Sequence, residues 1–371
     1  MWVSVRGFMD HLTAITWFAL GILTKRRYDM LRHRFGDLDQ ALHALDGTLL
    51  REMGCKPETI ERTLLMKARL HVAMYAKRME DSGIGLLSSE DEAYPKMLRE
   101  IGDPPVFLSY HGDLSLLEHP CLGIVGTRAM SSYGKRVVET FVPTIVAHHV
   151  VTVSGLALGV DSAVAQQTLA CGGQTIAVLG NGLGSIYPLT NTQLAEQIVA
   201  GGGLLLSEFP LDIVPTKYTF PSRNRLIAGV SRGVLVVEAG EKSGALITAD
   251  LAIDYGREAF AIPGSIFSEG SMGCHRVITR GEAKLVTFPE EVLCEIGIIQ
   301  RKSKADASVA DAYAPQSAEE TKVLRILSGL PLSSSDIVEA TGMEAGAVSA
   351  ALTTLELAGV AGNTMEGWIR R

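Results

Sequence analysis

The sequence has few of the features that mark metal sites, disulfide frameworks or membrane spans. Its five cysteines are scattered over 371 residues, with no CxxC pair and no neighbouring set of histidines. This spacing supports neither a zinc site nor a disulfide framework, and it fits reduced thiols in a cytoplasmic protein. The most apolar early stretch, LTAITWFALGIL at 12–23, is too short to span a bilayer and lacks a signal-peptide cleavage site, so we expect a buried helix there.

An excess of positive charge is also lacking. The formal net charge of −7 at pH 7 argues against a protein that coats nucleic acid indiscriminately. Net charge does not describe a local cleft, so nucleic-acid binding has to be judged site by site. The composition, with 47% hydrophobic and 20% charged residues, is that of a globular protein, and the length predicts two or three domains.

The hydrophobic pattern predicts an α/β domain between two smaller modules. Residues 1–82 show helical spacing, interrupted by short turns, and predict a small all-helical module. Within 83–298, five continuous apolar runs begin near positions 121, 150, 175, 203 and 233, and helical patterns fill the intervals. Such runs are typical of strands buried on both faces, so we expect a doubly wound, mainly parallel sheet. The segments 83–87 and 106–110 are expected to add strands at one side of it.

The last part of the chain predicts a separate module. Residues 299–317 are small, polar and aperiodic, which is typical of an exposed linker. Residues 318–371 show three helical segments followed by a hairpin with a central glycine. This order is typical of a winged helix, a module that binds DNA in some proteins and docks other proteins elsewhere.

Glycine, serine and basic residues follow the predicted parallel strands. In an open parallel sheet, ligands bind beyond the carboxyl ends of the strands, where loops and helix N-termini meet. Loops of Gly, Ser and Thr let backbone amides approach an anion closely, so we expect this crevice to bind phosphate. The residues concerned are Gly126 and Arg128 after the first run, Ser154 and Gly155 after the second, and Lys242, Ser243 and Gly244 after the fifth.

The stretch FPSRNRLIAG at 220–229 adds an aromatic ring and two arginines. Ser222 is predicted to cap a helix that begins at Arg223, with Lys217 and Phe220 just upstream; Ser243 is predicted to cap the next helix. An arginine at a helix N-terminus is unfavourable unless an anion offsets the helix dipole, and Phe220 offers a stacking face for a base. Repeated phosphates with an aromatic platform favour single-stranded nucleic acid over a free nucleotide.

Other interpretations of these loops are weaker. No GxGxxG follows the first run and no acidic residue ends the second, so a dinucleotide cofactor is not indicated; the P-loop pattern is absent too. Glu208, Glu238 and Asp161 are candidates for hydrolytic chemistry, but no histidine or metal cluster accompanies them. Arg225 contacts a ligand or pairs internally with Glu208 or Glu238; the sequence leaves both open.

Six blocks taken together resemble one family. They resemble, in the same order, the blocks of the bacterial DNA-processing protein A family (DprA, also called Smf), over roughly 84–288. The blocks are GIVGTRAMSSYG at 123–134, SGLALGVDSAVAQQTL at 154–169, TIAVLGNGLGSIYPLTNTQLAEQI at 175–198, LLSEFP at 205–210, the long block 220–264 that begins FPSRNRLIAG, and SMGCHRVITRGEAKLV at 271–286.

The resemblance implies an extended Rossmann-like domain without a cofactor, which binds single-stranded DNA, dimerises and loads the RecA recombinase during natural transformation. The resemblance also implies that the protein catalyses no reaction of its own. Members of the family often carry a helical N-terminal module and a winged-helix C-terminal module, which match both ends of this chain. The predicted single-strand site comprises Gly126, Arg128, Ser154, Gly155, Lys217, Phe220, Arg223, Asn224, Lys242, Ser243 and Gly244. The dimer surface is expected around His275, Ile278 and Leu285.

The sequence departs from the family pattern in places. Ala165 stands where the second block commonly has a histidine, so any role of that histidine is absent. The last block has GCHRVI in place of GTNRLI and one extra residue in GEAKLV, which bears on the dimer geometry. ILTKRRYD at 22–29 lacks the glycines of a helix-hairpin-helix, which weakens the case for DNA contact there.

Two rival functions come from other classes. A nucleotide-processing hydrolase of the lysine-decarboxylase-like group has a similar domain, but its PGGxGT signature is missing, since EAGEKSG occupies that place. A transcription regulator would read duplex DNA with the winged helix. The expected third helix of that module exposes almost no Arg or Lys, which argues against major-groove readout.

Overall fold

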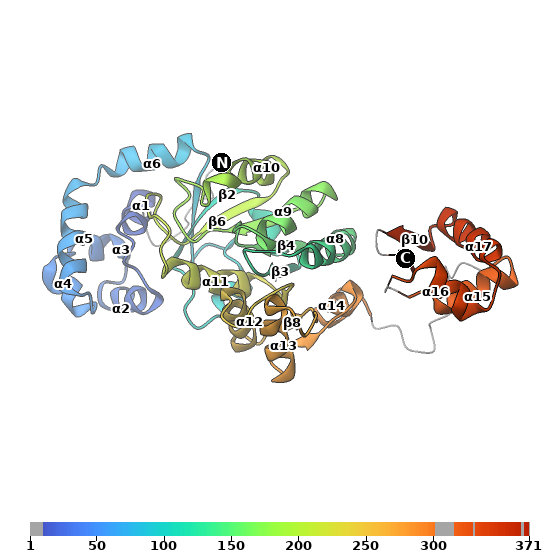
Figure 1. Ribbon diagram of the computed structural model, residues 1–371. Coiled ribbons are helices and arrows are strands. Elements are labelled where there is room, and N and C mark those ends of the chain that lie inside the picture. The colour runs from blue at the N-terminus through green and yellow to red at the C-terminus, as the bar shows by residue number, and fades with distance from the viewer. Residues whose placement is uncertain (1–9, 301–314, 329–330, 365–366, 371) are drawn as a thin grey trace. The chain divides into compact units, whose positions relative to one another are not determined.

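A nine-stranded sheet forms the centre of the first of two units, Met1–Gln300 and Arg301–Arg371, into which the chain divides. The computed structural model describes residues 10–300, 315–328, 331–364 and 367–370 (Figure 1). The strand order is β1-β2-β6-β5-β4-β3-β7-β8-β9. From β3 the chain winds outward through β4, β5 and β6 and then returns to place β7 on the other side of β3, which makes a topological switch point there.

The five predicted parallel strands are confirmed. They are β3 (Cys121–Val125), β4 (Val151–Ser154), β5 (Thr175–Val178), β6 (Leu204–Ser207) and β7 (Gly233–Val236), and every residue in them is buried. The helices that connect or follow them are α8 (Ser132–Ala147), α9 (Val160–Ala170), α10 (Thr192–Ala200), α11 (Thr219–Val230) and α12 (Gly244–Asp254). Helices cover both faces of these strands, which explains why the strands are apolar throughout.

The sheet has more strands than the sequence predicted. β1 (Gly85–Ser88) and β2 (Phe107–Gly112) form the expected addition at one side, and β2 pairs antiparallel with β6. At the other side, β8 (Glu258–Ala261) and β9 (Lys284–Leu285) continue the parallel part and were not predicted. Three short helices, α7 (Lys96–Arg99), α13 (Met272–Thr279) and α14 (Pro289–Glu295), complete this region.

From residue 10 onward, where the described part of the chain begins, six helices precede the sheet. They are α1 (His11–Leu20), α2 (Lys25–Phe35), α3 (Leu38–His43), α4 (Gly47–Glu52), α5 (Pro57–Arg69) and α6 (Val72–Asp81). The predicted buried helix at 12–23 corresponds to α1, where the Trp17 indole N–H donates to the carbonyl of Leu38 at 3.1 Å. The Phe18 ring packs edge-on against Phe107 of β2, so these helices share a hydrophobic core with the sheet. Among the described residues, no helix combines the length and the apolar character that crossing a bilayer requires.

The second unit has the order of elements that was expected for a winged helix. It contains α15 (Ala318–Ile326), α16 (Ser334–Thr341), α17 (Ala345–Leu357) and the antiparallel pair β10 (Ala361–Thr364) and β11 (Gly367–Arg370). Its own core includes Val323, Ile337 and Leu352. Of the predicted linker at 299–317, residues 301–314 lie outside the described residues.

Candidate nucleic-acid interface

A crevice of about 490 Å³ opens at the carboxyl ends of β3 and β7, beside the switch point. Its walls come from the loops after β3, β4 and β7 and from one face of α11. The crevice brings together eight of the eleven residues predicted for the single-strand site. These eight are Gly126, Arg128, Phe220, Arg223, Asn224, Lys242, Ser243 and Gly244.

Three flat groups lie next to one another at the mouth of the crevice. The guanidinium carbon of Arg128 lies 4.8 Å from the centre of the Phe220 ring. The Tyr187 ring lies 6.0 Å from Phe220 on a tilted plane, at 46°. Phe220 packs on Gly180, where an added Cβ atom would lie 3.0 Å from the phenyl ring. A small hollow of about 40 Å³ at this point is lined by Arg128, Tyr187, Phe220 and the exposed Leu158.

Tyr187 was not among the residues predicted for the site. It lies in the Gly-rich loop after β5, in the stretch GLGSIYP, and 44% of it is exposed. An exposed aromatic residue in a loop at a strand end is the signal that could have identified it, because that position faces the ligand edge of a parallel sheet.

The backbone around the crevice is tightly packed on one side and open on the other. At Gly126 an added Cβ atom would lie 2.6 Å from Val160, so a side chain there would force the loops apart. At Gly244, the first residue of α12, it would meet no atom within 4 Å. Ser243 caps α12 as predicted, with its hydroxyl accepting from the amide of Ala245 at 3.3 Å. The exposed Lys242 stands beside this helix N-terminus, which suits an anion.

Helix α11 begins one turn earlier than predicted. Its first residue is Thr219, so Ser222 is inside the helix and donates its hydroxyl to the carbonyl of Tyr218 at 3.1 Å; the predicted N-cap role of Ser222 is wrong. The turn that leads into the helix is fixed by Thr216 and Thr219, which exchange side-chain and backbone hydrogen bonds. Pro221 does not mark a boundary because the first helical turn needs no intrahelical donor.

Arg223 lies at the floor of the crevice rather than at its surface. It is 5% exposed, and its guanidinium donates to the carbonyl of Val178 at the end of β5. The guanidinium lies against Gly155, where an added Cβ atom would be 1.8 Å from Nη1. Burial lowers the pKa of Arg223, and the nearby Asp161 opposes that change. Asp161 itself accepts from the amide of Gly155 at 3.0 Å, in the loop after β4 against which the guanidinium lies.

Three of the predicted residues, Ser154, Gly155 and Lys217, are not part of this cavity lining, and Gly155 lines the small hollow beside Phe220 instead. Ser154 ends β4 and is 2% exposed, beneath the crevice. Lys217 is exposed just before α11, with its ammonium 5.1 Å from the centre of the Tyr218 ring. A cation in this position can contact a strand that leaves the crevice along the start of α11.

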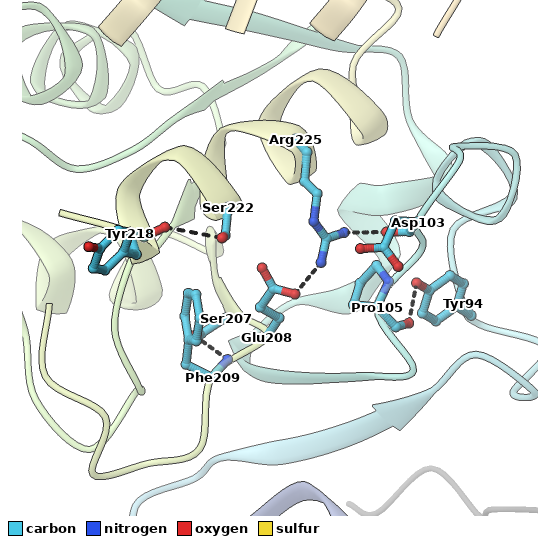
Figure 2. A network of polar contacts seen from close by, with 9 residues as sticks. All are labelled: Tyr94, Asp103, Pro105, Ser207, Glu208, Phe209, Tyr218, Ser222 and Arg225. Atoms are coloured by element: carbon cyan, nitrogen blue, oxygen red, sulfur yellow. Dashed lines mark hydrogen bonds and ion pairs between the residues drawn. The ribbon is translucent and has the colours of Figure 1, made fainter. Parts of the chain in front are cut away.

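The two other candidate carboxylates, Glu238 and Glu208, make contacts within the protein. Glu238 accepts from the backbone amide of Ser131 at 2.9 Å, next to the start of α8. Glu208 forms an ion pair with Arg225, whose other guanidinium nitrogen donates to the carbonyl of Asp103 at 2.6 Å (Figure 2). The question that the sequence left open for Arg225 is therefore answered in favour of an internal pair with Glu208.

The residues predicted for the dimer surface lie at the end of the first unit. His275 and Ile278 belong to α13, and Leu285 ends β9. The His275 ring interacts with the carbonyl of Gly264 through Nε2 at 3.0 Å, so it orders the loop after β8. Leu285 is 45% exposed and Phe267, in the same loop as Gly264, is 92% exposed.

Comparisons with known proteins agree with the sequence blocks. A model of the family described as DNA recombination-mediator protein A matches residues 85–297, which is more than half of the chain. The chain belongs to the DNA recombination-mediator protein A family. A second model, the DprA winged helix domain, matches residues 307–362. The predicted resemblance and the predicted winged-helix module are thereby confirmed.

Several named relatives share this family. Protein Smf of Escherichia coli is 42% identical over 249 residues, which cover 67% of this chain and 66% of that protein. Protein Smf of Synechocystis is 34% identical over 372 aligned positions, which cover 91% and 92%. DNA processing protein DprA of Streptococcus pneumoniae is 47% identical over 205 residues, which cover 55% and 72%.

Two solved structures of the family are similar to this fold. The X-ray structure of the Streptococcus pneumoniae protein has a TM-score of 0.65 and 38% identity, over 80% of this chain and 99% of that one. The DNA processing protein A of Helicobacter pylori has a TM-score of 0.51 and 32% identity, over 56% and 94%. The Helicobacter structure was described for its unique single-stranded DNA binding mode.

Proposed function

We propose that the protein binds single-stranded DNA in the crevice and presents it to a RecA recombinase during the processing of incoming DNA or in recombination. It does so as a binding protein, without a reaction of its own. The observation that carries the proposal is the row of Arg128, Phe220 and Tyr187 beside the amide-rich start of α12.

The row suits an unpaired strand rather than a duplex. Aromatic faces bind bases by stacking, and in a duplex those faces are covered by neighbouring base pairs. The guanidinium plane of Arg128 can stack on a base or contact a phosphate, and Phe220 packs against Gly180. Stacking reads no hydrogen-bond pattern, so we expect little sequence preference.

Phosphate contacts complete the proposed site. Lys242 and the amides at the start of α12 lie on one side of the row, and the exposed Lys217 lies before α11. Arg223 adds positive charge from below and, through its hydrogen bond to the carbonyl of Val178, holds α11 to the end of β5. Ser154 and Gly155 shape the floor rather than donate to the ligand from the surface.

The partners follow from the same proposal. We assign the surface around His275, Ile278 and Leu285 to a homodimer, because exposed apolar side chains gather in the same part of the first unit. The named relatives in Streptococcus and Bacillus are DNA processing proteins, and the matched family is called a recombination mediator. A RecA recombinase in the cytoplasm is the partner that such a mediator requires.

The first experiment is fluorescence anisotropy of a labelled poly-dT oligonucleotide at several salt concentrations, with duplex DNA and a mononucleotide as competitors. Arg128→Ala is expected to weaken binding and to lower the slope of log K against log salt by about 0.7, the value for one lost phosphate contact on a single strand. Competition by single strands and not by the mononucleotide supports the proposal.

The opposite result would identify a different function. If the mononucleotide competes as well as the oligonucleotide and salt has little effect, the crevice holds a small molecule. A nucleotide-processing hydrolase then becomes the hypothesis to test. Its three candidate carboxylates, Asp161, Glu208 and Glu238, all have internal partners in this structure, which favours the binding protein.

A further inference from the structure

Helix α11 presents two different faces. Phe220, Arg223 and Asn224 line the crevice. Ser222 and Arg225 instead line a second cavity of about 270 Å³, which lies between the ends of β2 and β6 and the helix α1. With 100° between successive residues, Arg225 points roughly opposite to Phe220 and Arg223 around the helix axis. A strand bound in the crevice therefore does not reach Arg225.

Arg225 connects α11 to two other segments of the sheet. Its guanidinium donates to the carboxylate of Glu208, directly after β6, and to the carbonyl of Asp103, in the loop before β2 (Figure 2). The side chains of the pair are 15% and 14% exposed. In the surface pair of Arg34 and Glu52 the corresponding values are 52% and 45%, so the Arg225 pair is far better shielded from water.

The segment that carries Glu208 is itself fixed. The hydroxyl of Ser207 accepts from the amide of Phe209 at 3.0 Å and donates to the carbonyl of Asn181 at 2.7 Å. Asn181 follows Gly180, the residue on which the Phe220 ring packs. The ion pair thus holds α11 to the segment after β6, the Phe220 ring packs on the loop after β5, and Ser207 joins these two neighbouring segments.

We propose that Arg225 and Glu208 are positioning residues for single-strand binding, which hold the first two turns of α11 so that Phe220 stands between Arg128 and Tyr187. This inference rests on the proposed function. An arginine suits the role because its planar fork reaches the Glu208 carboxylate and the Asp103 carbonyl at once. A lysine keeps the charge but replaces this fork with a single nitrogen.

The test compares Arg225→Met and Arg225→Lys with Arg34→Met, which breaks the exposed pair of the same residue types. Poly-dT affinity is measured by anisotropy across a salt series. Both Arg225 variants are expected to bind about tenfold more weakly at every salt concentration, similar to the loss of a supporting partner elsewhere. Their salt slope should equal that of the parent protein, because no phosphate contact is removed. Arg34→Met is expected to bind like the parent.

Two outcomes would overturn the inference. A salt slope lowered by about 0.7 in Arg225→Met, as expected for Arg128→Ala, would mean that Arg225 contacts phosphate directly. Unchanged affinity in both Arg225 variants would mean that the pair does not position the site. Cooperative thermal unfolding of each variant shows that it is folded. If Arg225→Met does not fold, the comparison is made with Arg225→Lys alone.

A measurement without DNA separates this inference from the proposed function. Hydrogen exchange of the amides of residues 222–224 is expected to become faster in Arg225→Met, while exchange in α12 stays as in the parent protein. If the parent protein binds no single-stranded DNA, the proposed function is wrong and exchange still decides whether the pair holds α11. Unchanged exchange in α11 would overturn the positioning role in either case.

Discussion

At the scale of single residues, Tyr187 is the side chain whose role is easiest to isolate. Stacking of one base on an aromatic ring contributes about 1–3 kcal/mol, so Tyr187→Ala is expected to raise the dissociation constant for poly-dT about 5- to 150-fold. The ring carries no charge, and the salt slope should stay unchanged. Anisotropy at two or more salt concentrations measures both quantities.

Matched variants show whether the ring itself is responsible. Tyr187→Phe keeps the stacking face and is expected to bind within about twofold of the parent protein. Leu189→Ala removes a neighbouring exposed side chain, 79% accessible, without touching the aromatic row. Equal losses in Tyr187→Ala and Leu189→Ala would contradict the stacking role, because they would indicate a general disturbance of the loop.

The substitution Gly155→Ala tests whether the buried Arg223 side chain can move. The added Cβ atom would fall 1.8 Å from Nη1 of Arg223, which is held by the carbonyl of Val178. Because this guanidinium is buried and hydrogen-bonded, we expect the substitution to cost about 1–3 kcal/mol of unfolding free energy. Chemical denaturation measures that cost.

A second glycine in the same crevice provides the control. Gly244→Ala adds a methyl group with no atom within 4 Å, at the first position of α12. Alanine is the better helix former, so this variant is expected to be as stable as the parent protein or slightly more stable, by less than about 1 kcal/mol. If both substitutions proved equally harmless, the close contact between Gly155 and Arg223 would not hold α11 in place.

At the scale of secondary-structure elements, the buried pair between α11 and β6 makes stability depend on pH. Burial raises the pKa of Glu208 to about 7, against the favourable Arg225 charge and with a further rise from Asp103. The folded protein therefore binds this proton more tightly than the unfolded chain does. The stabilisation from the protonated form is complete below about pH 4.5 and is lost as pH rises through about 7.

Glu208→Gln isolates this contribution because glutamine resembles the protonated acid. The unfolding free energy of the parent protein minus that of the variant is expected to fall by about 3 kcal/mol between pH 4.5 and 8. Denaturation at five or six pH values measures the difference. A difference that stays constant over this range would show that the pKa of Glu208 is not raised. The charged pair would then hold α11 without a cost in stability.

Prediction from sequence succeeded where one physical requirement determines the pattern. β3 to β7 are buried on both faces, so they need continuous apolar runs, and each was found in the sequence. β8 contains the short buried run AFAI at 259–262, directly after the exposed Glu258, and this run was overlooked. β9 has two residues and shows no such run, because its strand character comes from pairing with β8.

The same distinction applies to the site. Loops of Gly, Ser and basic residues at strand ends could be identified, because the fold brings all such ends to one edge. The start of α11 was misplaced by one turn because Pro221 is compatible with a first helical turn as well as with a preceding loop. That error put Arg223 in the first turn of the helix, whereas in the structure it lies one turn further in and is buried.

At the scale of the whole molecule, the net charge of −7 and a site for an anionic polymer are compatible. Arg128 and Lys242 line the crevice and Lys217 is exposed just before α11, and net charge does not describe the charge of such a local site. The second unit has its own core and none of the residues of the proposed site. The proposed single-strand site therefore lies entirely within the first unit, and the assembly of copies is a separate question.

Leu285 tests the assembly that the family resemblance predicts. It ends the edge strand β9 and is 45% exposed, so a carboxylate at this position costs a single copy little but would be buried in a dimer. Leu285→Glu is expected to halve the molar mass measured by light scattering while leaving the thermal unfolding of the first unit nearly unchanged. Leu357→Glu, at an 86% exposed leucine of α17, is the matched control and should keep the parent mass.

A dimer that survives Leu285→Glu would place the interface elsewhere. A monomeric variant that still binds a short dT oligonucleotide like the parent would show that one copy holds a complete crevice, and that dimerisation acts on the arrangement of strands between copies.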